Sequence, residues 1–203
     1  MTITLHKNDL PEDLDLGPIV AIDTETMGLR AVRDRLCLVQ LSSGDGNAHL
    51  VQMPQGKIEA PNLAKMLADP KVLKLFHFAR FDVAMLYNAL GVMASPVYCT
   101  KIASKLTRTY TDRHSLRELC REILSVDLSK QQQSSDWGAE TLTDAQQAYA
   151  ASDVLYLHDI RTRLDEMLAR EGRTELAQAS FDYLPTRALL DLGGWPDDDI
   201  FAH

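Results

Sequence analysis

The 203-residue chain has few cysteines, no long apolar run and no excess of positive charge. Its three cysteines, Cys37, Cys99 and Cys120, lack metal-ligand spacing, so we expect reduced, mostly buried thiols in a cytoplasmic protein. No apolar run is long enough to span a bilayer, and the acidic start does not resemble a secretory signal, so we expect no membrane partner. The net charge of −8 argues against a protein that follows a long phosphate backbone.

Three common site motifs are also missing. The sequence contains no GxxxxGK[ST] loop, no HExxH helix and no GxGxxG turn. Nucleoside triphosphatase, zinc protease and dinucleotide dehydrogenase functions therefore have no support in the chain.

The order of apolar patterns predicts an α/β fold. We expect strands at 19–25, 35–43, 48–53, 71–78 and 95–100. We expect helices at 60–70, 79–91, 101–108, 114–125, 141–172 and 173–191, the last interrupted by Pro185. Three antiparallel strands come first, and two further strands then alternate with helices, which predicts a mixed five-stranded sheet flanked by helices. We divide the chain into an N-terminal arm at 1–16, a main domain at 17–170 and a C-terminal helical extension at 171–203.

Four carboxylates and one tyrosine end or follow apolar runs in three separate segments. Asp23 and Glu25 lie two residues apart in IVAIDTET, which puts both side chains on one face of a strand. Asp82, in HFARFD, falls in the first turn of a helix. Tyr149 and Asp153, in YAASD, are four apart on a helix and share a face. Acids carried on rigid elements from distant parts of the chain are what a hard divalent cation needs.

Each segment taken alone has a plainer explanation. The strand-end pair could be a surface feature, Asp82 a first-turn acid favoured by the helix dipole, and Tyr149 a core aromatic. Asp153 is harder to dismiss, because an acid inside an apolar helical run is costly unless it is paired or bound to metal. The order and spacing of the three segments together favour metal-dependent hydrolysis.

The three segments resemble the motifs of the DEDD 3′–5′ exonucleases, which have a ribonuclease H-like (DnaQ-like exonuclease) fold. DTE matches the first motif, HFARFD the second and YAASD the third, and the tyrosine four residues before the last acid is typical of the DEDDy subclass. The stretch VDLSKQQQSSDWGAETLTDAQQAYAASDVLYL is similar to ribonuclease D. The chain is shorter than ribonuclease D and more closely resembles the short single-domain NrnC-type oligoribonucleases.

This resemblance implies a set of roles. Asp23, Glu25, Asp82 and Asp153 would bind two divalent ions, Mg²⁺ or Mn²⁺, and Tyr149 would orient or deprotonate the attacking water. The expected activity is 3′–5′ hydrolysis of short oligoribonucleotides, especially dinucleotides, to nucleoside 5′-monophosphates. The expected assembly is a homo-oligomer, which the resemblance suggests is a ring-shaped octamer.

Substrate-binding residues are predicted in four places. By resemblance to oligoribonucleases, Leu29 would wedge between the two terminal bases, with local packing in its loop as the alternative. A short substrate also needs cations and donors on its 5′ phosphate. We expect these from two segments. The polar loop at 129–138 offers Lys130, Gln133, Ser134 and Ser135, and the basic stretch at 101–121 offers Arg108, Tyr110, Arg113 and His114. Neighbours of the motif acids complete the expected set: Thr24, Met27, Gly28, His77 and Phe81.

Several alternatives stay open. His77 could instead be a buried strand histidine with a backbone partner, and Trp137 either stacks near the substrate or pins its loop. Most of the basic stretch could be a solvated helix face. A broader ribonuclease D-like exonuclease acting on longer or structured RNA, or on single-stranded DNA, is the second functional hypothesis. A catalytically inactive binding module is the third.

Overall fold

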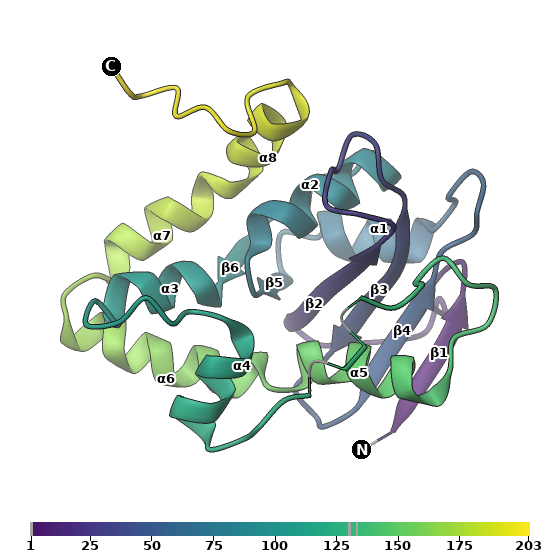
Figure 1. The fold of residues 1–203 in the computed structure, drawn as a ribbon, viewed down its shortest axis with the longest axis horizontal. Helices are drawn as coiled ribbons and strands as arrows, with labels where there is room; N and C mark the ends of the chain where they lie inside the picture. Colours follow the sequence, from purple (N-terminus) through teal and green to yellow (C-terminus); the bar gives the residue numbers. More distant parts are fainter. Residues whose placement is uncertain (1, 130, 133) are drawn as a thin grey trace.

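The computed structural model describes residues 2–129, 131–132 and 134–203, which form one mixed sheet with helices on both faces (Figure 1). The strands are β1 Ile3–Lys7, β2 Ile19–Thr26, β3 Leu36–Ser42, β4 Ala48–Gln52, β5 Leu73–Phe76 and β6 Val97–Cys99. They lie in the order β1-β4-β3-β2-β5-β6. The β2–β3 and β3–β4 pairs are antiparallel and the others are parallel.

The helices that surround the sheet follow the predicted order. They are α1 Pro61–Ala68, α2 Ala79–Leu90, α3 Thr100–Thr107, α4 Leu116–Leu119 with its π-helical continuation η1 Cys120–Leu124, α5 Asp144–Leu155, α6 Leu157–Arg170, α7 Thr174–Asp182 and α8 Leu184–Leu192. Among the described residues, no helix is both long and apolar enough to cross a membrane.

The prediction of an α/β, DnaQ-like sheet is confirmed, but the sheet has six strands rather than five. The extra strand is β1, in the segment expected to be an arm, and it pairs in parallel with β4. Its sequence, ITLHK, carries no buried residue among those described, so it lacks the apolar run by which strands are recognised. Asp9, just after β1, accepts hydrogen bonds from the backbone N–H groups of Asn62 and Leu63 and so caps α1. The segment at 1–16 is thus tied to the main body.

The long helix predicted at 141–172 is two helices. α5 ends at Leu155, Tyr156 leaves the regular helical path with φ −103° and ψ −3°, and α6 begins at Leu157. The break lets α5 lie on β2, β3 and β4 while α6 packs against α3. Thr143 caps α5 with a capping box to Gln146.

The C-terminal extension packs on the rest of the molecule. α7 contacts α3 and β6, and α8 contacts α2. Pro185 lies in the first turn of α8, so it marks the start of a new helix, as expected. The division at residue 170 stays a prediction.

The two faces of the sheet carry different helices. α5 lies on the face that includes Leu38 and Leu50, where Trp137, Leu142 and Ala150 form a small apolar cluster. The larger core joins α1, α2, α3 and α6 to the rest of the sheet. Residues that alternate along β2 therefore point alternately toward α5 and toward the larger core.

Candidate active site

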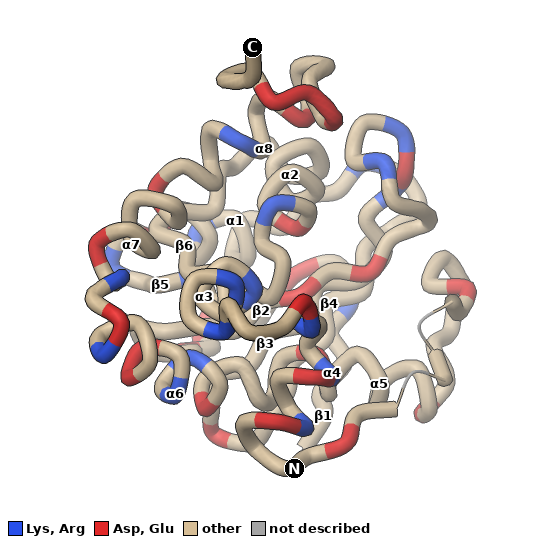
Figure 2. The backbone as a smooth tube through the Cα atoms, turned by 60° about the vertical axis from the view of Figure 1, so that its left-hand side comes forward, with Lys and Arg blue, Asp and Glu red and all other residues tan. Residues whose placement is uncertain are grey.

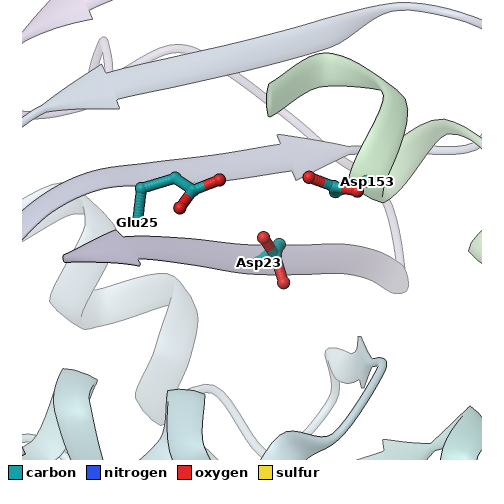
Figure 3. Close-up of side chains that lie close together, drawn as sticks. All are labelled: Asp23, Glu25 and Asp153. Carbon is teal, nitrogen blue, oxygen red and sulfur yellow. The ribbon is translucent and has the colours of Figure 1, made fainter. Parts of the chain in front are cut away.

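Three of the predicted acids meet where α5 crosses β2. Asp23 and Glu25 extend from one face of β2, and Asp153 extends toward them from α5 (Figure 3). One carboxylate oxygen from each lies within 4.8 Å of the others. The strand period and the packing of α5 on the sheet thus bring together acids that are about 130 residues apart in the chain.

Burial and mutual repulsion make these carboxyls weak acids. Burial raises the pKa of Asp23 to about 7. Burial, followed by the charges of Asp23, Asp153 and Asp82, raises the pKa of Glu25 to about 10. The pKa of Asp153 is also well above its usual range, through burial and the charge of Asp23. A divalent cation would remove this repulsion, so the residues fit a hard metal ion that prefers oxygen ligands.

The fourth predicted acid lies apart from this group. Asp82 is buried in the first turn of α2, and its carboxylate accepts a 2.6 Å hydrogen bond from the Thr24 hydroxyl. Burial and the charge of Asp23 raise the pKa of Asp82 well above its usual range. Thr24 is expected to touch substrate, but it does not line the cavity that opens over the acids. Its hydroxyl is used in the hydrogen bond to Asp82 instead. The structure therefore brings three acids together and holds the fourth on Thr24.

Tyr149 faces the same acids from one turn before Asp153. Its pKa is raised by burial and by the charges of Asp153, Glu25 and Asp23. Its ring lies 6.1 Å from that of Trp137, centre to centre, at an interplanar angle of 37°. The hydroxyl stays protonated at neutral pH and is therefore available as a hydrogen-bond donor.

A cavity of about 720 Å³ opens over the acids. Six of the predicted substrate-binding residues line it: Met27, Gly28, Leu29, His77, Ser134 and Ser135. Leu29 is 86% exposed, which leaves its side chain available to a ligand. His77 Nδ1 lies 2.9 Å from the Thr100 hydroxyl oxygen, and burial lowers the His77 pKa to about 3, so the ring is neutral.

Much of the predicted basic stretch lies elsewhere. Arg108 is buried, pairs with Glu122 and donates to the Arg113 carbonyl at 2.8 Å, so it is a structural cation. His114 Nδ1 lies 2.8 Å from the Ser104 hydroxyl oxygen. Arg108 and His114 are absent from the cavity lining that the described residues form, as are the predicted residues Phe81, Tyr110 and Arg113. Lys130 and Gln133 lie outside the described residues.

Sequence reasoning missed other lining residues, which include two cations. The main ones are Phe78, Lys101, Ser115, Arg117 and Ser129. The Lys101 ammonium lies 4.2 Å from the centre of the Phe78 ring. Helix α3 carries Lys101 and Lys105, and its basic positions are blue in Figure 2. Phe78 has φ 68°, which is uncommon for a non-glycine residue. Strained backbone of this kind clusters at functional sites, but no sequence pattern predicts it.

Comparisons with known proteins agree with this geometry. A family model described as a 3′-5′ exonuclease matches residues 6–169. The chain belongs to the 3′–5′ exonuclease family. A ribonuclease D from Gluconacetobacter diazotrophicus is 34% identical over 175 residues, which cover 86% of this chain and 44% of that protein. The chain thus spans less than half the length of the curated ribonuclease D relatives it matches.

Among the solved structures that match over the whole chain, two are of one protein. NrnC from Brucella melitensis with bound Mg²⁺ is 57% identical, with all of both chains covered and a TM-score of 0.96. The same protein bound to pGG is 58% identical, with 100% of this chain and 99% of that chain covered and a TM-score of 0.97. Within the exonuclease family, the chain therefore groups with the short NrnC type, as its sequence predicted.

Proposed function

We propose that this protein is a metal-dependent 3′–5′ exoribonuclease that hydrolyses short oligoribonucleotides, especially dinucleotides, to nucleoside 5′-monophosphates. The observation that carries the proposal is the group of three carboxylates from β2 and α5 within 4.8 Å of one another at a large cavity. Membership of the exonuclease family supports the reaction type. We keep two divalent ions, Mg²⁺ or Mn²⁺, as the proposed cofactors.

Each residue has a distinct task in this proposal. Asp23, Glu25 and Asp153 hold the ions, and Asp82, oriented by Thr24, supplies the fourth carboxylate. Bound divalent ions would polarise the scissile phosphodiester, activate water and stabilise the leaving oxygen. Tyr149 donates to or positions the attacking water. The raised carboxyl pKa values mean that the ions and protons compete for these oxygens, so activity should rise with pH.

Three observations support a short substrate. Lys101 and Arg117 line the same cavity as the acids, so one small ligand can meet metal at one end and cations at another. Exposed Leu29 lines it too and can separate two bases. NrnC of Brucella melitensis, which is similar over its whole length, was solved with pGG bound.

Self-association and location remain proposals. Exposed apolar side chains gather on α7, α8 and the tail, which supports a homo-oligomer, proposed as a ring-shaped octamer: Leu176, Leu189, Trp195, Ile200 and Phe201. The three free, buried cysteines agree with a reducing, cytoplasmic compartment. Light scattering of the purified protein measures the assembly.

The test is a rate comparison on pGG and a 5′-phosphorylated heptaribonucleotide, with and without EDTA. We expect faster cleavage of pGG, stepwise 5′-monophosphate products and no turnover in EDTA. Equal or faster cleavage of the heptamer would favour the broader ribonuclease D-like activity. Turnover that survives chelation would exclude a metal mechanism, and no turnover on any RNA would leave the inactive binding module.

A further inference from the structure

Gln40 is a buried amide in direct contact with the acidic group. It lies on β3 opposite Asp23 in the antiparallel β2–β3 register, so both side chains are on the same face of the sheet. Its residue exposure is 0%, and its Nε2 donates a 3.3 Å hydrogen bond to Asp23 Oδ2. The other amide atom, Oε1, is buried and has no hydrogen-bond partner among the described residues.

An apolar side chain would be the less costly choice at this position. The sequence of β3 is LCLVQLS and all seven residues are buried, so Gln40 sits among aliphatic neighbours. A buried acceptor without a partner destabilises the folded protein relative to a satisfied one. A residue that carries such a cost and touches a predicted metal ligand points to a role in the site rather than in packing.

The chemistry of the amide suits that role. A lysine or arginine here would neutralise Asp23 and repel a metal ion, and a carboxylate would add a further negative charge to the acidic group. An amide N–H instead fixes one oxygen of Asp23 without changing the net charge. Groups that hydrogen-bond to metal ligands orient them in this way.

We infer that Gln40 is a positioning residue that holds the Asp23 side chain in its metal-binding orientation. The inference rests on the proposed metal site and deepens it. It assigns one oxygen, Asp23 Oδ2, to the Gln40 amide, and it leaves Oδ1 as the oxygen that is not held by this contact.

The test replaces the amide with a side chain of the same length. Gln40→Met keeps the unbranched shape but neither donates nor accepts as an amide does. We expect Mn²⁺ binding, titrated by calorimetry without RNA, to weaken about 10-fold, because loss of a ligand-orienting hydrogen bond costs 10–100-fold in affinity. The turnover number at saturating Mn²⁺ should also fall, while KM for pGG stays near its wild-type value.

Ser42→Ala is the matched control. Ser42 is buried on the same strand, and its hydroxyl donates to the Asn47 carbonyl at 2.7 Å, away from the acids. It should lower the thermal midpoint and leave Mn²⁺ affinity unchanged. If Gln40→Met does not fold, Gln40→Leu, which matches the aliphatic neighbours on β3, takes its place.

Unchanged Mn²⁺ affinity in a folded Gln40 variant would overturn the inference and leave Gln40 as a core residue. This outcome is separable from failure of the proposed function. If the wild-type protein binds no Mn²⁺, the proposed metal site is wrong. If the wild-type protein and the Gln40 variant bind Mn²⁺ with equal affinity, only the role of Gln40 is wrong. Because the titration uses no RNA, it stays decisive whatever the nuclease assay gives.

Discussion

The acidic cluster and the rim of the same cavity are built in opposite ways. The acidic cluster, Asp23, Glu25 and Asp153, comes from a central strand and a helix packed on it. The rim, which we define as Leu29, Phe78, Lys101, Ser115 and Arg117, comes from loops and helix ends and is mostly exposed. Elements of the core therefore fix the position of the acidic cluster, while the rim can vary without disturbing the fold.

This difference separates reaction type from substrate choice. Burial raises the pKa values of the cluster carboxyls, so a bound cation would favour their charged form. The rim carries the cations and the exposed leucine that would grip a phosphate and a base. Changes in the cluster should thus abolish turnover on every substrate, and changes in the rim should alter preference among substrates.

The largest effect is expected from a cluster acid. Asp153→Asn keeps the shape of the side chain and removes a charge that binds metal. We expect turnover on pGG and on the heptamer to fall about 1,000-fold, since a catalytic metal contributes several kcal/mol to transition-state stabilisation. Asp159→Asn, an exposed acid on the neighbouring helix α6, is the control and should leave both rates unchanged. A near-wild-type rate in Asp153→Asn would remove the acidic cluster from the mechanism.

The cluster could be predicted from sequence because its geometry is local. A two-residue spacing on a strand and a four-residue spacing on a helix each place two side chains on one face. The packing of α5 on β2 then brings Asp153 to Asp23. Gln40 was not predicted, because its contact depends on the β2–β3 register, which the sequence of either strand alone does not give.

The rim could not be predicted in the same way. The basic residues predicted to bind substrate include Arg108, which the fold buries against Glu122, and exclude Lys101, which the fold brings to the cavity. Lys101 lies in the first turn of α3, whereas Arg108 is the cap residue at the other end of that helix. Charge composition identifies a basic stretch, but packing decides which of its members reach the ligand. Strand β1 was missed for a similar reason, since an edge strand without buried residues has no apolar signal.

The rim cations provide the next prediction. Lys101→Met and Arg117→Met should each raise KM for pGG about 10-fold or more, since a charge-assisted hydrogen bond contributes about 1.5–3 kcal/mol. The effect should disappear on GpG, which lacks the 5′ phosphate. Lys105→Met is the control, because Lys105 is exposed on the same helix and does not line this cavity. An equal rise in KM for pGG and GpG would mean that these cations do not contact the 5′ phosphate.

Leu29 tests whether the rim sets substrate length. Leu29→Ala should lower the preference for pGG over the heptamer by about 10-fold, the effect of removing about two buried methylene groups from the complex. Thermal stability should not change, because the side chain is 86% exposed. Val32→Ala, 64% exposed and absent from the cavity lining, is the control. An unchanged length preference would indicate that Leu29 does not contact the bases.

The smallest effect returns to the cluster through its pKa values. In metal-free protein the folded state holds protons on Asp23 and Glu25 more tightly than the unfolded state, because their pKa values rise from 3.8 to about 7 and from 4.5 to about 10. Stability from these groups is therefore complete below pH 4 and is lost as pH rises through the folded-state values. In EDTA the thermal midpoint should fall by about 5 °C between pH 5 and pH 8, an effect of one to a few kcal/mol. Mg²⁺ should restore more of the midpoint at pH 8 than at pH 5, because the ion replaces protons that the cluster no longer holds.

The Lys101→Met rim variant should show the same pH dependence as wild type, whereas Asp153→Asn, with one charge fewer in the cluster, should show less. A midpoint in EDTA that rises over this range would mean that the carboxyls are stabilised by other protein groups rather than by a cation.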